Sequence, residues 1–258
     1  QIETHPEDAR YMDGHYRETV LYLVMQQHDP PLDVVQRLVD VYPAALVESC
    51  TKNHDFPLHI ACSFDAEPSI IKLLVGSNPA TAILQTRWGK TPLVALWELR
   101  QKQQELRIRQ QEEEEQLPLQ QQRQQQEINN QDEEGQQEEQ PLDSVENKVT
   151  DGNDVIFWEK VEIILRGVAL HRRSFHEKGS TTSTAFRLQD DNGPFFIVHA
   201  AVSLASLGCP YPILEWALRK YPEQVQMKDE RGLLPLHICI GPSQWTISST
   251  GGGGGGGG

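Results

Sequence analysis

Residues 34–46 (VVQRLVDVYPAAL) and residues 70–82 (IIKLLVGSNPATA) carry the same pattern, 36 positions apart. A third copy follows at residues 213–225 (ILEWALRKYPEQV). In each copy the apolar residues recur at i, i+1, i+4 and i+5, which is the stripe of an amphipathic helix, and a proline follows about one turn later. The repeated stretch therefore predicts three helices of one kind, each stopped by its proline.

A second repeated motif lies between these helices. It reads FPLHIAC at residues 56–62, TPLVA at 91–95 and LPLHIC at 234–239, with a weaker copy, FIVHAA, at 196–201. Proline is favourable in the first turn of a helix, because its missing N–H would have no partner there. Turn residues precede each copy. The unit is therefore a turn, a short helix that begins near the proline, a tight connection, a second helix and a return.

Together these motifs resemble the ankyrin repeat, a unit of ~33 residues with a TPLHxA-like start. The resemblance covers roughly residues 14–100 and 154–240, and residues 89–93 (GKTPL) and 235–237 (PLH) are its most specific pieces. It implies an all-α fold, an ankyrin-like helical solenoid of about five helix-turn-helix repeats. In the family's motif, Thr and His three residues apart share a hydrogen bond. No copy here keeps both residues, so we expect these repeats to lack that bond and to rely more on packing.

A low-complexity segment interrupts the repeats. Residues 101–148 contain 16 glutamines, 13 acidic residues and 5 basic residues. Good helix formers fill the chain to about Glu115, so we expect the helix that starts at Thr91 to continue that far, and the insertion to be disordered beyond Pro118. The insertion is either an acidic or glutamine-rich contact segment or a tolerated expansion. The predicted organisation is an N-terminal segment (1–13), a first block of repeats (14–100), the Gln/Glu-rich insertion (101–152), a second block (153–240) and a Gly-rich tail (241–258).

The register of the repeats also predicts a core and an end to the stack. The second helix of the interrupted repeat is expected at residues 155–170 (VIFWEKVEIILRGVAL). No second helix follows Ile240, so we expect residues 243–250 to fold back as a cap, unless the native chain continues. The side chains expected to be buried against a neighbouring repeat are Leu58, Ile71, Leu74, Leu93, Ile164, Val198, Leu214, Leu218 and Leu236.

Composition excludes several classes of partner. The 258 residues include 37 acidic and 23 basic side chains, a net charge of −14. Binding to nucleic acid or to an anionic membrane requires clustered Lys and Arg, so the charge argues against both. No apolar run approaches the ~20 residues of a membrane span, and we expect no membrane insertion. The four cysteines form no CxxC pair, which favours reduced thiols and a cytoplasmic location, with a nuclear one possible.

No motif indicates catalysis, a metal or a cofactor. The sequence contains no GxxxxGK[ST], GxGxxG or GxSxG. His59, His199 and His237 lie at the start of repeat helices, which favours a structural role. His171 and His176 have a spacing that zinc sites use, but no cysteine pair precedes them. We therefore expect no catalytic residue, no metal site, no cofactor and no enzyme activity.

Two functions remain open. The first, which the ankyrin resemblance implies, is a non-catalytic interaction module that binds an unidentified protein partner through its hairpin tips and concave face. The second is a regulatory segment of a larger enzyme or channel, with the chemistry elsewhere in the protein. Trp88 is the most conspicuous tip residue, although it could instead pack on the next hairpin. The predicted partner-binding residues are Asn53, His54, Asp55, Arg87, Trp88, Lys90, Asp191, Asn192, Asp229, Glu230 and Arg231.

Overall fold

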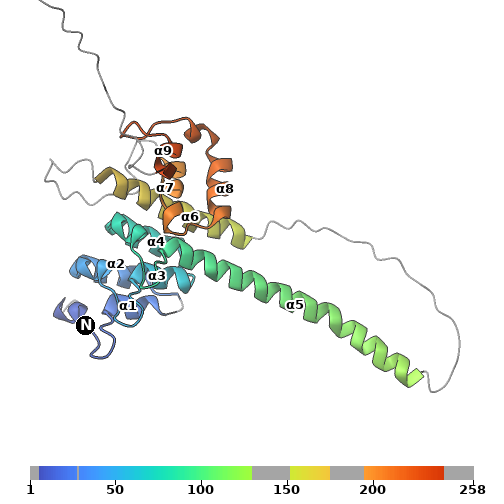
Figure 1. Cartoon of the computed structure of the whole chain (residues 1–258). Coiled ribbons are helices and arrows are strands. Elements are labelled where there is room, and N and C mark those ends of the chain that lie inside the picture. Colours follow the sequence, from blue (N-terminus) through green and yellow to red (C-terminus); the bar gives the residue numbers. More distant parts are fainter. Residues whose placement is uncertain (1–5, 28, 130–151, 175–194, 241–258) are drawn as a thin grey trace, which may run out of the picture.

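Helices form the described part of the chain. The structure is a computed structural model that describes residues 6–27, 29–129, 152–174 and 195–240 (Figure 1). Within these ranges there is no β-strand, and the single extended pairing is an isolated antiparallel bridge between Met12 and Thr19. The prediction of an all-α fold is confirmed. The Gly-rich tail (241–258), with the predicted cap at residues 243–250, lies outside the described residues.

The helices begin and end close to the positions that the repeats predict. The α-helices are α1 (Val20–Met25), α2 (Leu32–Val41), α3 (Pro57–Ser63), α4 (Pro68–Ser77), α5 (Pro92–Asn129), α6 (Gly152–Ser174), α7 (Ile197–Ser203), α8 (Tyr211–Lys220) and α9 (Pro235–Ile240). The 3-10 helices are η1 (Pro6–Arg10), η2 (Pro43–Val47), η3 (Pro79–Ile83), η4 (Ala205–Leu207) and η5 (Pro222–Val225).

Proline defines both ends of these short helices. Pro57, Pro68 and Pro92 are the first residues of α3, α4 and α5. At this position a backbone N–H would have no acceptor within the helix, so the missing N–H of proline costs no hydrogen bond. The helices α2, α4 and α8 each have 10 residues, and each is followed by a 3-10 helix that begins with a proline: η2, η3 and η5. The stop signals read from the sequence are therefore confirmed.

Successive helices pack as neighbours in two rows. One row contains α1, α3 and α5, and the other contains α2, α4 and α6, while α1 packs on α2 and α3 on α4 (Figure 1). Beyond α6, α7 contacts α6, α8 and α9. Each helix buries one apolar side against the next, and this gives a continuous core that includes Ile71, Leu74, Leu93, Ile164 and Val198, all fully buried.

The core prediction fails at the last helices. Leu58 is buried as expected, and Leu214 is half-buried, but Leu218 is 38% exposed and Leu236 is 64% exposed. Helix α8 places Ile213 and Ala217 against its neighbours, and no described helix follows α9. The side chains that would face a further helix pair therefore remain in contact with solvent.

Two of the repeat histidines join successive helix units through the backbone. His59 donates from Nε2 to the carbonyl of Lys90 at 2.9 Å, and His199 donates in the same way to the carbonyl of Leu233 at 3.1 Å. Burial lowers the pKa of His59, so the ring is neutral and can hold this single N–H donor at Nε2. Phe56 and Phe196 stand three residues before these histidines and offer no side-chain hydrogen bond, and Nδ1 of both rings is buried without a hydrogen-bond partner among the described residues.

Helix α5 is longer than predicted. It continues through Pro118 to Asn129, so the boundary expected near Glu115 and the disorder expected directly beyond Pro118 are wrong. Its first turns are anchored by the buried Leu93 and Leu96, while residues 101–114 are all exposed, and the helix projects from the rest of the molecule (Figure 1). A packed first turn removes the cost of nucleation, and Gln, Glu and Arg then favour propagation. Residues 130–151 of the insertion lie outside the described residues.

Helix α6 returns to the core after the insertion and packs closely on α4 and η3. The glycine at position 167 allows this approach, because a Cβ there would lie 2.2 Å from Val75 Cγ1 and 3.3 Å from Ala82 Cβ. Ile164 and Leu165 on the same helix are fully buried. The long interruption therefore leaves the packing of the two rows intact.

We predict that Gly167→Ala destabilises the protein by about 1–3 kcal/mol, because the added methyl group must displace the branched side chain of Val75. Chemical denaturation of the full chain measures this. Gly14→Ala is the matched control, since a Cβ at Gly14 meets nothing within 4 Å. If both variants unfold at the same denaturant concentration as the parent chain, the close approach of α6 to α4 is wrong.

Candidate functional site

The turns that precede the repeat helices are closed hairpin tips. We name them tip one (residues 13–18), tip two (50–55), tip three (86–90) and the last tip (229–233). In each, the N–H of the first residue donates to the carbonyl of the last: Asp13 to Glu18, Cys50 to Asp55, Thr86 to Lys90 and Asp229 to Leu233, at 2.8–3.1 Å. A backbone ring of this kind holds the intervening side chains in a fixed orientation.

A side-chain oxygen at the first position strengthens three of the four rings. Asp13 accepts from the N–H groups of Tyr16 and Glu18 at 3.0 and 2.8 Å, and Thr86 accepts from Lys90 N–H at 3.3 Å. Asp229 accepts from Arg231 N–H and Leu233 N–H, both at 2.9 Å. Sequence reasoning missed these anchors. Their signal is position, because Thr86 and Asp229 each precede the proline of the following helix by six residues.

The first three tips are also joined to one another. The N–H of Thr51 donates to the carbonyl of Tyr16 at 2.8 Å, and the N–H of Arg87 donates to the carbonyl of Asn53 at 3.0 Å. Tips one, two and three therefore form a continuous row, in which each tip is fixed to the previous one by its backbone. Rigid presentation of this kind reduces the entropy lost on binding.

The side chains of tip three face solvent. Trp88 is 63% exposed, so packing of its indole on the next hairpin is wrong. Arg87 and His54 are exposed as well, whereas Asn53 and Asp55 are half-buried. Lys90 pairs with Glu98 of α5, with its ammonium nitrogen 2.6 Å from the carboxylate. The row thus presents Arg87, Trp88 and His54 outward.

The last tip is bound to α6 instead of being free. Asp229 is only 8% exposed and pairs with Arg172 at 3.0 Å. Glu230 pairs with Arg173 at 2.5 Å, and Arg231 donates to the carbonyl of Arg172 at 3.1 Å. That these three residues contact a partner stays a prediction; they hold the end of α6, and Glu230 and Arg231 keep exposed surface. Asp191 and Asn192 lie outside the described residues.

The electrostatics of Asp229 agree with an anchoring role. Burial opposes ionisation of its carboxyl group, but the N–H donors of Leu233 and Arg231 and the guanidinium of Arg172 outweigh this effect and lower its pKa. The carboxylate is therefore charged at neutral pH, where it holds both the tip and Arg172.

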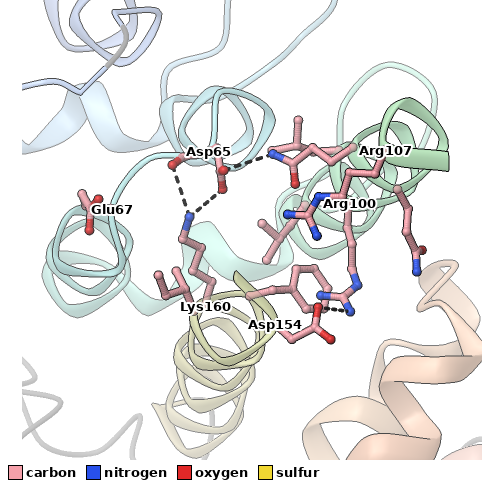
Figure 2. Close-up of a pocket in the computed structure, with 12 residues that line it drawn as sticks. Asp65, Glu67, Arg100, Arg107, Asp154 and Lys160 are labelled. Carbon is pink, nitrogen blue, oxygen red and sulfur yellow. Dashed lines mark hydrogen bonds and ion pairs between the residues drawn. The ribbon is translucent and has the colours of Figure 1, made fainter. Parts of the chain in front are cut away.

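A polar cavity of about 430 Å³ lies where α5 leaves the core (Figure 2). Asp65 and Glu67 line it from the α3–α4 turn, Arg100 and Arg107 from α5, and Asp154 and Lys160 from α6. Three cationic and three anionic side chains thus surround it.

Ion pairs occupy the walls of this cavity. Lys160, only 3% exposed, places its ammonium nitrogen 2.6 Å from Asp65 Oδ1 and 3.2 Å from the carbonyl of the same residue. Arg100 pairs with Asp154 at 2.8 Å and stacks on the ring of Phe157 at 4.2 Å from its centroid. These contacts fix the base of α5 against α6 and the α3–α4 turn. We therefore assign the cavity a structural role, which sequence reasoning did not find.

The remaining reactive groups have structural surroundings. Burial raises the pKa of the thiols of Cys62 and Cys209 to about 12, which keeps both protonated and unreactive. Within the described ranges, no three His, Cys, Asp or Glu side chains lie close enough together to hold a metal ion. Among the surfaces that the described residues form, the row of tips one, two and three is the candidate functional site.

Comparison of the chain with protein-family models, with curated proteins and with solved structures finds no match. In the part of the chain that the structure describes, no helix combines the length and the apolar character needed to cross a membrane.

We predict that Asp65→Asn destabilises the protein by about 1–3 kcal/mol, because it leaves the buried ammonium group of Lys160 without its counter-charge. Asparagine keeps the shape of the side chain and tolerates the left-handed backbone of this position, where φ is 60°. The double variant Asp65→Asn/Lys160→Met should recover most of the loss, since no buried charge remains. Equal stability of the parent chain and Asp65→Asn in denaturation would contradict the assigned role of this pair.

Proposed function

We propose that this chain is a non-catalytic protein-interaction module, built as an ankyrin-like solenoid, that binds another polypeptide through tips one to three and the concave face beside them. The sequence resemblance to the ankyrin repeat supports this proposal, as do the two rows of paired helices. Four helix pairs plus α9 among the described residues agree with about five repeats.

The observation that carries the proposal is the exposed Trp88 beside Arg87 on tip three. A buried Trp side chain removes about 150–250 Å² from water, worth several kcal/mol at ~25 cal/mol per Å², and most of this is not gained in the isolated chain, where Trp88 is 63% exposed. Trp and Arg are also the side chains that most often dominate protein interfaces. A partner that covers tip three would bury the indole and pair the guanidinium.

The binding set is smaller than the sequence predicted. Arg87, Trp88, Asn53, His54 and Asp55 belong to it, because they lie on the linked tips two and three. We exclude Lys90, which pairs with Glu98, and the last tip, which is bound by α6. The proposed location is a reducing compartment, the cytoplasm or the nucleus, since Cys50, Cys62, Cys209 and Cys239 are free.

A regulatory segment of a larger enzyme or channel is the second candidate. The observation that favours it is the apolar surface at α8 and α9, where Leu218, Leu236 and Ile240 are exposed. A further structural unit packed on this surface would bury them. The two candidates are compatible, because a regulatory segment can act by binding a protein through its tips.

We predict that the double variant Arg87→Ala/Trp88→Ala weakens binding of the partner by about tenfold, or about 1.4 kcal/mol, while the melting temperature moves by only a few degrees. Partners are first recovered by cross-linking to the immobilised parent chain and then titrated with the purified variants. The matched control is Tyr211→Ala/Arg219→Ala, which removes an exposed aromatic and an exposed arginine from α8. Normal binding by the Arg87/Trp88 variant would overturn the proposal.

A further inference from the structure

We propose that tips one to three form a cationic strip that binds an acidic, extended polypeptide segment. This inference rests on the proposed function and specifies the chemistry of the partner. It follows from the charges of the tips, from the way the tips are joined, and from the spacing that the helix rows impose.

The exposed permanent charges of the strip are positive. Its exposed ionisable side chains are His15, Arg17, Lys52, His54 and Arg87, of which the two arginines and the lysine carry a permanent charge. The acidic residues of the same tips, Asp13, Glu18 and Asp55, are half-buried, and the carboxylate of Asp13 already accepts backbone N–H groups of its own tip. A cationic surface is unusual in a chain with 37 acidic and 23 basic residues.

The excess of negative charge lies mostly elsewhere. Residues 101–148 hold 13 acidic and 5 basic side chains, or −8 of the total of −14. Since ions screen exposed charges over about 8–10 Å at physiological salt, a ligand on the strip experiences chiefly the charges of the tips themselves, of which the cations are the more exposed. An acidic ligand can therefore approach the tips despite the net charge of the chain.

The strip combines its cations with aromatic surface. The ammonium group of Lys52 lies 5.3 Å from the centroid of the Tyr16 ring, which links tip two to tip one, and Trp88 is exposed beside Arg87 on tip three. Arg17 and His54 adopt a left-handed backbone, with φ of 56° and 55°. This conformation costs most residues free energy, and here it occurs at the same place in both tips, directly before the residue that closes the tip.

The spacing of the tips selects an extended ligand. Packed helices lie 8–10 Å apart, and an extended chain advances ~3.3 Å per residue, so carboxylates about three residues apart reach successive tips. The guanidinium groups of Arg17 and Arg87 can bind carboxylates in a bidentate manner, and Tyr16 and Trp88 can pack on the residues between. Nucleic acid fits less well, because such complexes neutralise about 6–10 phosphates and the strip offers few permanent charges.

The test is a fluorescence-anisotropy titration of the full chain with a labelled peptide of about twelve residues that carries glutamate at every third position. The same peptide with glutamine at those positions is the ligand control. We expect about tenfold tighter binding of the glutamate peptide, and weaker binding at about 200 mM than at about 50 mM salt. The variant Arg17→Glu/Lys52→Glu should lose about tenfold in affinity, whereas Arg219→Glu on α8 should bind like the parent chain.

Three results would overturn this inference: equal binding of both peptides, no effect of the charge reversals in a variant with a native circular-dichroism spectrum, or equally tight binding of a single-stranded oligonucleotide. If the reversals impair folding, Arg17→Gln/Lys52→Gln replaces them and should give a smaller loss. A partner that depends on Trp88 and Arg87 but not on Arg17 and Lys52 would leave the proposed function intact and refute the acidic ligand.

Discussion

Burial of apolar surface between neighbouring helix pairs is the constraint on which the rest of this structure depends. Helices as short as α1, α3 and α7, with six or seven residues each, do not persist alone in water. They persist here because each one covers the next. The insertion into the α5–α6 pair is tolerated for the same reason, since α6 still places Ile164 and Leu165 in the core and fits its glycine against Val75.

Packing of the helices in this core also holds the tips rigid. Helices on either side fix the ends of each turn, the closing hydrogen bonds fix its shape, and the bonds from Thr51 to Tyr16 and from Arg87 to Asn53 fix one tip to the next. The histidine bond from His59 to the carbonyl of Lys90 ties tip three to α3. An exposed tryptophan and several exposed cations are therefore presented on a surface that has little conformational entropy to lose on binding.

The repeated pattern predicts the helices well, because apolar spacing and proline position are local signals. It predicts the interactions between distant segments poorly. Lys160 pairs with Asp65 across 95 residues of sequence, and Arg172 pairs with Asp229 across 57. Both pairs depend on where α6 packs on the core after the insertion. For this reason Asp229 was expected on a binding surface and lies buried instead. Leu218 and Leu236 were expected in the core because the prediction placed each of them against a neighbouring repeat.

Hydrogen–deuterium exchange of the full chain, read by mass spectrometry, tests the dependence on stacking most directly. Amides of α6 between residues 157 and 170 should exchange as slowly as those of α4, because the two helices open as one unit. Amides of α5 between residues 108 and 114 should exchange much faster, since these residues are exposed. If the α6 amides exchange as fast as those of the projecting part of α5, α6 is not packed into the row and this account of the fold is wrong.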